Sequence, residues 1–112
     1  MNVAIIGLGI IGGSYAKGLS KAGYKVYGVD KDLMTIEYAK SEGFIIDGSS
    51  NPGDYISVAD LVVIGLYPDD VVPFIEKNIQ YFKKGQVVTD VCGVKKSICH
   101  KATQLLESSC FV

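Results

Sequence analysis

The stretch that decides the fold is "VAIIGLGIIGGS", Val3 to Ser14, in which a short apolar run gives way to glycines. A continuous apolar run is typical of a strand buried on both faces, and helical spacing of apolar residues begins at about Ile11. Gly7, Gly9 and Gly12 form a G-x-G-x-x-G pattern between the two. The pattern predicts a tight turn out of the strand at Gly7, close approach of a ligand at Gly9, and close packing of the helix on the sheet at Gly12.

This glycine-rich turn predicts a site for the diphosphate of a dinucleotide. The unpaired N–H groups of the first helical turn face such a ligand, and the helix dipole adds about half a positive charge. Glycine-rich turns also occur for packing alone, which is the alternative interpretation. The residues of the turn predicted to bind the cofactor are Gly7, Leu8, Gly9, Ile10, Ile11 and Gly12.

Asp30 follows 18 residues after Gly12, at the predicted end of the second strand, where a carboxylate accepts hydrogen bonds from both hydroxyls of an adenosine ribose. The carboxylate also repels a 2′-phosphate: unit charges about 4 Å apart at an effective dielectric near 20 interact by about 4 kcal/mol, and less in solvent. A third of that energy gives roughly tenfold discrimination, so Asp30 favours NAD over NADP, although Lys31 partly compensates. The alternative is that Asp30 only caps the helix that starts after Lys31.

Strand-like and helix-like segments alternate along the rest of the chain. Apolar runs predict further strands at 26–29, 44–46, 61–64 and 86–89, and Asp47 to Tyr55 is a loop by composition. Alternation of this kind implies βαβ units and right-handed crossovers. The sequence therefore predicts a single α/β domain over residues 1–112, a doubly wound parallel sheet of the Rossmann type with helices on both faces.

The helices are predicted from caps and periodicity. Ala16, Leu19 and Ala22 mark the first, before Gly23; Asp32 caps the second, which Gly43 ends. The next is predicted to start at a cap, Asp69, with Pro73 in its first turn and Lys83 and Lys84 in its last, before Gly85. A final helix is expected over 94–105.

Composition excludes several classes of function. The 112 residues carry a formal net charge of -1 without a stripe of Lys and Arg, which argues against nucleic acid or an anionic membrane as partner. Three cysteines without CxxC spacing argue against a disulfide framework or a metal site. No apolar run reaches the roughly 20 residues of a membrane span, and the N-terminus does not resemble a signal peptide. We expect a cytoplasmic protein.

Two later segments fall at the carboxyl ends of strands, where open α/β sheets bind ligands. Leu66, Tyr67 and Pro68 follow the fourth predicted strand and are expected to line the cofactor groove. Cys92 and Gly93 follow the fifth and are expected near the nicotinamide end.

The segments "IIGLGIIGGSYAKGL", "GVDKD", "ADLVVIGLYPDD" and "TDVCGVK" occur in this order over essentially the whole chain. Together they resemble the nucleotide-binding domain of the prephenate/arogenate dehydrogenase family. The resemblance implies NAD as cofactor and the oxidative decarboxylation of prephenate to 4-hydroxyphenylpyruvate in tyrosine biosynthesis, or the corresponding reaction of arogenate. It also implies a C-terminal helical domain that dimerises, so we expect the full-length protein to be a homodimer with a small-molecule substrate.

The sequence departs from the family pattern at two places. Cys92 and Gly93 stand where the family often has Gly-Ser, and Gly93 lacks a hydroxyl to reach the substrate. The family's catalytic histidine lies in a Gly-x-His-Pro segment after the next strand, and this sequence stops at Phe111-Val112, so we expect a truncated cofactor half and assign no catalytic residue. The alternatives are another dehydrogenase or reductase of the hydroxyacid type, and a non-catalytic nucleotide-sensing module.

Other polar residues have simpler interpretations. His100, the only histidine, falls in the last predicted helix and is expected at its surface. Adjacent acids such as Asp69 and Asp70 usually cap helices, and we expect Asp90 to do the same. Lys95 matches a family lysine and opposes the helix dipole, which leaves contact with an anionic substrate open.

Overall fold

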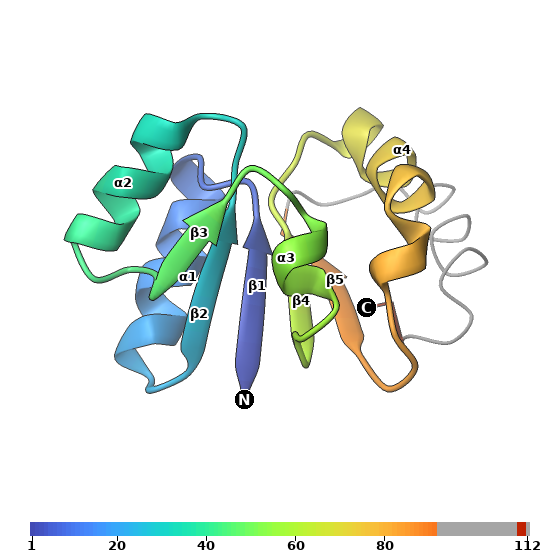
Figure 1. The fold of residues 1–112 in the computed structure, drawn as a ribbon, viewed down its shortest axis with the longest axis horizontal. Helices are drawn as coiled ribbons and strands as arrows, with labels where there is room; N and C mark the ends of the chain where they lie inside the picture. The colour runs from blue at the N-terminus through green and yellow to red at the C-terminus, as the bar shows by residue number, and fades with distance from the viewer. Residues whose placement is uncertain (92–109, 112) are drawn as a thin grey trace.

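The computed structural model of the chain describes residues 1–91 and the backbone of residues 110–111. Strands and helices alternate along it (Figure 1). The strands are β1 (Asn2–Ile6), β2 (Lys25–Val29), β3 (Asp47–Ser49), β4 (Leu61–Ile64), β5 (Val87–Asp90) and β6 (Cys110–Phe111). The helices are α1 (Ile10–Lys21), α2 (Leu33–Ser41), α3 (Gly53–Ile56) and α4 (Pro68–Lys77), followed by a 3-10 turn at Ile79–Tyr81.

The six strands form one parallel sheet in the order β3-β2-β1-β4-β5-β6. The chain begins in the middle of the sheet, adds strands outward to β3, and then returns to the other side of β1 for β4. Loops leaving β1 and β4 therefore turn toward opposite faces, which makes their shared carboxyl edge the switch point where open α/β sheets bind ligands. The predicted doubly wound sheet is confirmed.

Helices cover both faces of the sheet, and alternate residues of β1 therefore pack into two separate apolar clusters, one on each face. Val3 and Ile5 pack with residues of α1 and α2, whereas Ala4 and Ile6 pack with residues of α3 and α4. All four side chains are buried. This two-sided burial is the physical reason for the uninterrupted apolar run that opens the sequence.

Two predicted helices have the expected ends. Asp32 caps α2: its Oδ1 accepts a hydrogen bond from the Met34 N–H at 2.9 Å. The glycines that follow α1 and α2, Gly23 and Gly43, have φ angles of 95° and 75°. A positive φ favours glycine over any residue with a Cβ, so these two positions end the helices as predicted.

The third strand was predicted at Phe44 to Ile46, and this is wrong. The strand is β3, Asp47–Ser49, and the segment predicted as a loop also contains α3. Phe44 and the buried Ile45 fill space under the helices instead of forming the ladder. The polar residues of β3 pair with β2 through their backbone. Hydrogen bonding at the edge of the sheet, rather than hydrophobicity, therefore determines which residues form this strand.

The fourth helix differs from its prediction at both ends. Tyr67 is its N-cap and Pro68 its first residue, so Asp69 lies in the first turn and is not the cap. Pro73 lies inside the helix, beyond the first turn where a missing N–H is tolerated. The helix ends at Lys77, because the buried Asn78 leaves helical geometry and its Nδ2 donates to the Phe74 carbonyl at 2.9 Å. Lys83 and Lys84 therefore lie in a loop.

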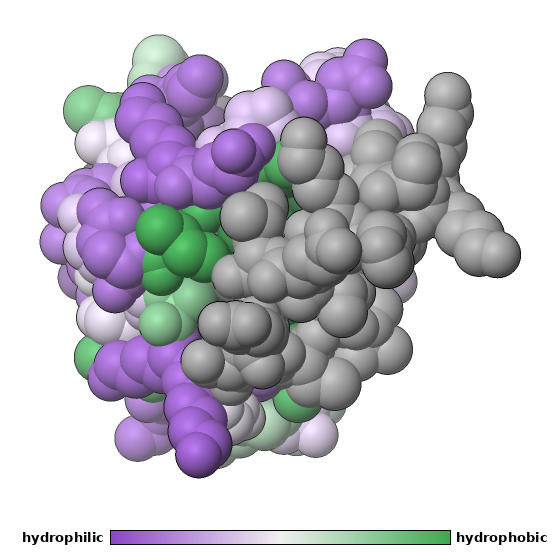
Figure 2. Space-filling view, turned by 90° about the vertical axis from the view of Figure 1, so that its right-hand side faces the viewer, coloured by the Kyte–Doolittle hydropathy of each residue, from purple (hydrophilic) through white to green (hydrophobic). Residues whose placement is uncertain are grey.

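The end of the sheet near β5 completes the described structure. Asp90 is the last residue of β5, one residue further along than the predicted strand, and the predicted helix at 94–105 lies outside the described residues. Figure 2 shows an apolar patch on this side of the molecule, with polar surface above and below it. No helix described within residues 1–91 is long and apolar enough to cross a membrane.

Candidate nucleotide-binding site

The glycine-rich loop leaves the central strand and is tied to both neighbouring strands. The Gly7 N–H donates to the Val29 carbonyl of β2 at 2.7 Å, and the Gly65 N–H donates to the Ile6 carbonyl at 2.7 Å. Backbone hydrogen bonds from β2 and β4 thus fix the point at which the chain turns from β1 into α1.

Two of the three motif glycines are required by the fold itself. Gly7 has a φ of 89°, and a Cβ there would lie 2.7 Å from the Gly65 carbonyl oxygen. A Cβ on Gly12 would overlap the carbonyl oxygen of Gly7. The close approach at Gly12 is therefore to the loop that precedes the helix, as well as to Ile5, whose Cγ2 would lie 3.6 Å away.

Gly9 has no such internal reason to be glycine. Its φ of -67° and ψ of -163° are open to any residue, and a Cβ there would find nothing within 4 Å. A side chain at this position would fill open space in front of the loop. The loop therefore leaves room for the predicted group at Gly9, the N-cap of α1.

The N-terminus of α1 has no acidic residue or side-chain cap of its own among the described residues. Gly9 is the N-cap without a side-chain hydrogen bond, and the first turn contains no acidic residue, whereas α4 has Asp69 and Asp70 there. Ile10 is 92% exposed and Ile11 48% exposed. The first-turn N–H groups and the positive end of the helix dipole therefore lie at an open surface, which suits an anionic ligand.

Asp30 lies beside the loop and holds it. Its Oδ2 accepts a hydrogen bond from the Leu8 N–H at 2.8 Å, and its Oδ1 accepts from the Asp32 N–H at 2.9 Å. The alternative that Asp30 caps the second helix is wrong, because Asp32 is the cap. A carboxylate has about four acceptor positions, so two backbone donors leave room for ribose hydroxyls.

Leu8, also in the predicted set, contributes differently from its neighbours. Its side chain is 6% exposed and packs in the apolar cluster beneath α1 and α2. Its N–H is already bonded to Asp30. Leu8 therefore anchors the loop, and its side chain does not belong to the exposed surface formed by Gly9 and Ile10.

The segment after β4 reaches the same edge. Leu66 packs partly buried against the cluster beneath α3 and α4, and its Cδ2 would lie 3.3 Å from a Cβ on Gly7. Tyr67 is 80% exposed, and Pro68 begins α4. Gly65 was not predicted to belong to the site. A Cβ added at Gly65 would lie 3.1 Å from the Gly7 oxygen and 3.3 Å from the Gly12 Cα. A glycine directly after a buried strand was the available signal.

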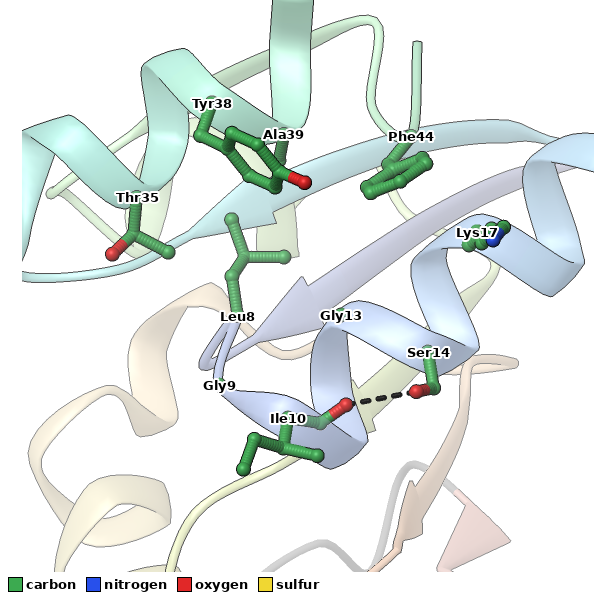
Figure 3. A pocket seen from close by; sticks show the side chains of 10 residues that line it. All are labelled: Leu8, Gly9, Ile10, Gly13, Ser14, Lys17, Thr35, Tyr38, Ala39 and Phe44. Atoms are coloured by element: carbon green, nitrogen blue, oxygen red, sulfur yellow. Dashed lines mark hydrogen bonds between the residues drawn. The ribbon is translucent and has the colours of Figure 1, made fainter. Parts of the chain in front are cut away.

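A cavity of about 440 Å³ opens between α1 and α2 at the outer side of the loop (Figure 3). The hydroxyl of Ser14, one of its lining residues, donates a hydrogen bond to the Ile10 carbonyl at 2.9 Å. The cavity shares Leu8, Gly9 and Ile10 with the predicted cofactor-binding set, whereas Asp30 and the segment after β4 do not line it. Its lining residues are Leu8, Gly9, Ile10, Gly13, Ser14, Lys17, Thr35, Tyr38, Ala39 and Phe44.

The remaining predicted residues, Cys92 and Gly93, lie outside the described residues, as do Lys95 and His100. Within the described part of the chain no group of three or more His, Cys, Asp or Glu is arranged to hold a metal ion.

A doubly wound sheet with a bare, uncapped glycine loop at its switch point defines a Rossmann-type nucleotide-binding domain. Residues 15–112 match the family described as "Prephenate dehydrogenase, nucleotide-binding domain". The chain belongs to this family. The match begins after Gly12, so it is independent of the glycine motif, and the resemblance drawn from the sequence is confirmed.

Known proteins agree with this assignment. The chain is 31% identical over 109 residues to a prephenate dehydrogenase of Lactococcus lactis subsp. cremoris, covering 96% of this chain and 30% of that protein. A Synechocystis arogenate dehydrogenase structure superposes with a TM-score of 0.89 at 28% identity, covering 95% of this chain and 38% of that one.

A prephenate dehydrogenase from Aquifex aeolicus, solved with hydroxyphenyl propionate and NAD+, superposes with a TM-score of 0.86 at 27% identity. The match covers 97% of this chain and 40% of that one. The chain thus spans less than half the length of these relatives, which are dehydrogenases.

Proposed function

We propose that this chain binds NAD as the cofactor-binding domain, residues 1–112, of a prephenate dehydrogenase. The observation that carries the proposal is Gly9, whose missing side chain serves no contact within the protein and leaves the uncapped start of α1 open. Family membership and the NAD+ in the Aquifex aeolicus complex support the choice of ligand.

In this proposal the diphosphate lies over Gly9, where the N–H groups near Ile10 and Ile11 donate to its oxygens. Hydrogen bonds to a charged group are about twice as strong as neutral ones, and the helix dipole adds to them. Leu66, Tyr67 and Pro68 border the same groove from the side of β4. Cys92 and Gly93 remain assigned to its nicotinamide end on sequence alone.

Asp30 gives the proposed preference for NAD over NADP. Its carboxylate keeps acceptor positions for the adenosine ribose after binding the two backbone N–H groups, and its charge opposes a 2′-phosphate. Lys31 is exposed next to it and reduces that repulsion without providing the bidentate contact of an arginine.

We further propose that the whole enzyme oxidatively decarboxylates prephenate, or arogenate, as a cytoplasmic homodimer. NAD supplies the hydride acceptor, and this chain's residues bind and orient it. No residue described here is assigned to the substrate, so catalysis is attributed to parts of the enzyme other than residues 1–91. No nucleic acid or membrane partner is proposed.

The proposal is tested in two measurements. Calorimetric titration with NAD, NADP and AMP should show NAD as the tightest ligand of the domain. Turnover of the intact gene product with prephenate, arogenate and a panel of hydroxy acids then identifies the substrate. Absence of NAD binding would contradict the cofactor proposal, and turnover of hydroxy acids alone would contradict the reaction.

A further inference from the structure

A glycine in the middle of β2 touches the nucleotide loop from below. Gly28 is buried, and a Cβ there would lie 2.6 Å from Leu8 Cδ1 and 3.2 Å from Leu8 Cδ2. Ile45 Cδ1 would lie 3.2 Å away. A glycine inside a strand weakens the strand, and it is found where another part of the chain approaches closely. Here the approaching group is the side chain of Leu8.

Leu8 is therefore held at two points, by Gly28 in β2 and by Asp30, which directly follows β2. Gly28 leaves room for its side chain, and Asp30, two residues further along, accepts its N–H at 2.8 Å. Gly9, the N-cap of α1, is the next residue after Leu8. Any displacement of Leu8 is transmitted through one peptide unit to the point where the diphosphate is proposed to lie.

We propose that Gly28 is a positioning residue for nucleotide binding, acting through Leu8 on the loop that contains Gly9. The inference rests on the proposed function, because it concerns the same ligand. Gly28 is buried in the sheet beneath Leu8, so its effect on affinity is expected to come from the position of the loop. The loop is held in place before the nucleotide arrives, which lowers the ordering cost of binding.

The test is the variant Gly28→Ala with a matched control on the neighbouring strand. The added methyl group would meet the far end of the Leu8 side chain, which is only 6% exposed and has little room to turn aside. We therefore expect Leu8 to move and NAD affinity to fall about tenfold, as expected for one lost charge-assisted hydrogen bond. Gly48→Ala is the control, because its Cβ would lie 2.7 Å from Ile36 Cγ2, 3.0 Å from the Gly28 carbonyl oxygen and 3.1 Å from Ile45 Cδ1. It therefore presses on the same strand and on the same Ile45 without meeting Leu8. It should keep NAD affinity within about twofold while disturbing the core comparably.

Rescue separates positioning from general damage. Leu8→Val removes both Cδ atoms that the methyl group of Gly28→Ala would meet, so the double variant should recover most of the lost affinity. Equal losses in Gly28→Ala and Gly48→Ala, or a Gly28→Ala protein with unchanged affinity, would overturn the inference. If Gly28→Ala alone does not fold, the double variant is compared with Leu8→Val: equal NAD affinity supports the inference, because Gly28 then acts only through the Leu8 side chain, and a roughly tenfold lower affinity of the double variant overturns it.

A measurement without nucleotide keeps this inference distinguishable from the proposed function. Hydrogen exchange of the Leu8 amide reports its bond to Asp30 directly, and it should accelerate in Gly28→Ala and not in Gly48→Ala. If wild-type protein binds no NAD, the proposed function fails, and the Leu8 amide still shows whether Gly28 positions the loop. Unchanged exchange in Gly28→Ala would refute the positioning role even with NAD bound.

Discussion

Replacing Gly9 with valine should remove nucleotide binding and leave the fold intact. The backbone at Gly9 is extended with a negative φ, and a Cβ there meets no atom within 4 Å. Two small effects on stability oppose each other: valine caps a helix less well than glycine, and it reduces the freedom of the unfolded chain. We expect the free energy of unfolding to change by less than about 1 kcal/mol, or about 4 °C in Tm.

The effect on binding is larger, because the valine side chain occupies the place of the diphosphate. Each hydrogen bond from a backbone N–H to a charged phosphate contributes about 1.5–3 kcal/mol. Losing one such bond weakens binding about 10- to 150-fold, and losing two brings NAD affinity below the range of ordinary titration. Gly9→Val is thus predicted to lose much NAD affinity while its free energy of unfolding changes little.

Isothermal titration calorimetry with NAD and thermal unfolding followed by circular dichroism measure the two quantities. Gly18→Val is the matched control: Gly18 lies on the same helix, is exposed, and also has nothing within 4 Å of a Cβ. It should bind NAD like the wild-type chain. A Gly9→Val protein that folds and binds NAD with unchanged affinity would show that the diphosphate does not lie over this loop.

Four further changes test neighbouring features. Asp30→Ser should shift the NADP-to-NAD affinity ratio about tenfold toward NADP in parallel titrations, and an unchanged ratio would contradict the electrostatic argument. Gly12→Ala should destabilise the fold by about 3 kcal/mol or more in urea unfolding, because its methyl group meets the Gly7 carbonyl. Pro73→Ala should stabilise α4 by about 1–3 kcal/mol in the same assay, and a lower midpoint would contradict this. Burial and the nearby Asp47 carboxylate raise the pKa of Tyr55 above its usual value. The neutral Tyr55 hydroxyl therefore contributes stability that is present below about pH 10 and is lost as pH rises through the folded-state pKa. In unfolding measured against pH, Tyr55→Phe should show a shallower decline in stability above about pH 10 than the wild-type chain.

The fold was predictable because its core strands are buried on both faces. An apolar run such as Leu61 to Ile64 has one explanation in an α/β protein, and β4 has these bounds. The prediction failed where the backbone, not an apolar side chain, decides: β3 is Asp-Gly-Ser, and its backbone forms the ladder with β2. It failed again at Lys77, where the apolar spacing continues through Ile79 although the helix has ended.

The candidate site was predictable as a loop but not as a set of contacts. The motif spans the junction of β1 and α1, with Gly7 and Gly9 between the two elements and Gly12 in the first turn of the helix. Spacing does not reveal that two of these glycines relieve clashes inside the protein while Gly9 faces open space. Nor does it show that Gly28 and Gly65, distant in sequence, lie against the same loop from β2 and β4.

These contacts divide the residues around the loop into two groups with different consequences. Gly28 and Gly65 touch the loop from within the sheet, and Asp30 bonds its backbone, so changes there move the whole site. Ile10 and Tyr67 are exposed at its rim, so changes there are expected to leave the loop in place and to alter at most single contacts with the proposed ligand. Because the backbone of the loop is bonded on both sides before any ligand binds, affinity depends on the packing of the central strands as much as on the residues that face the nucleotide.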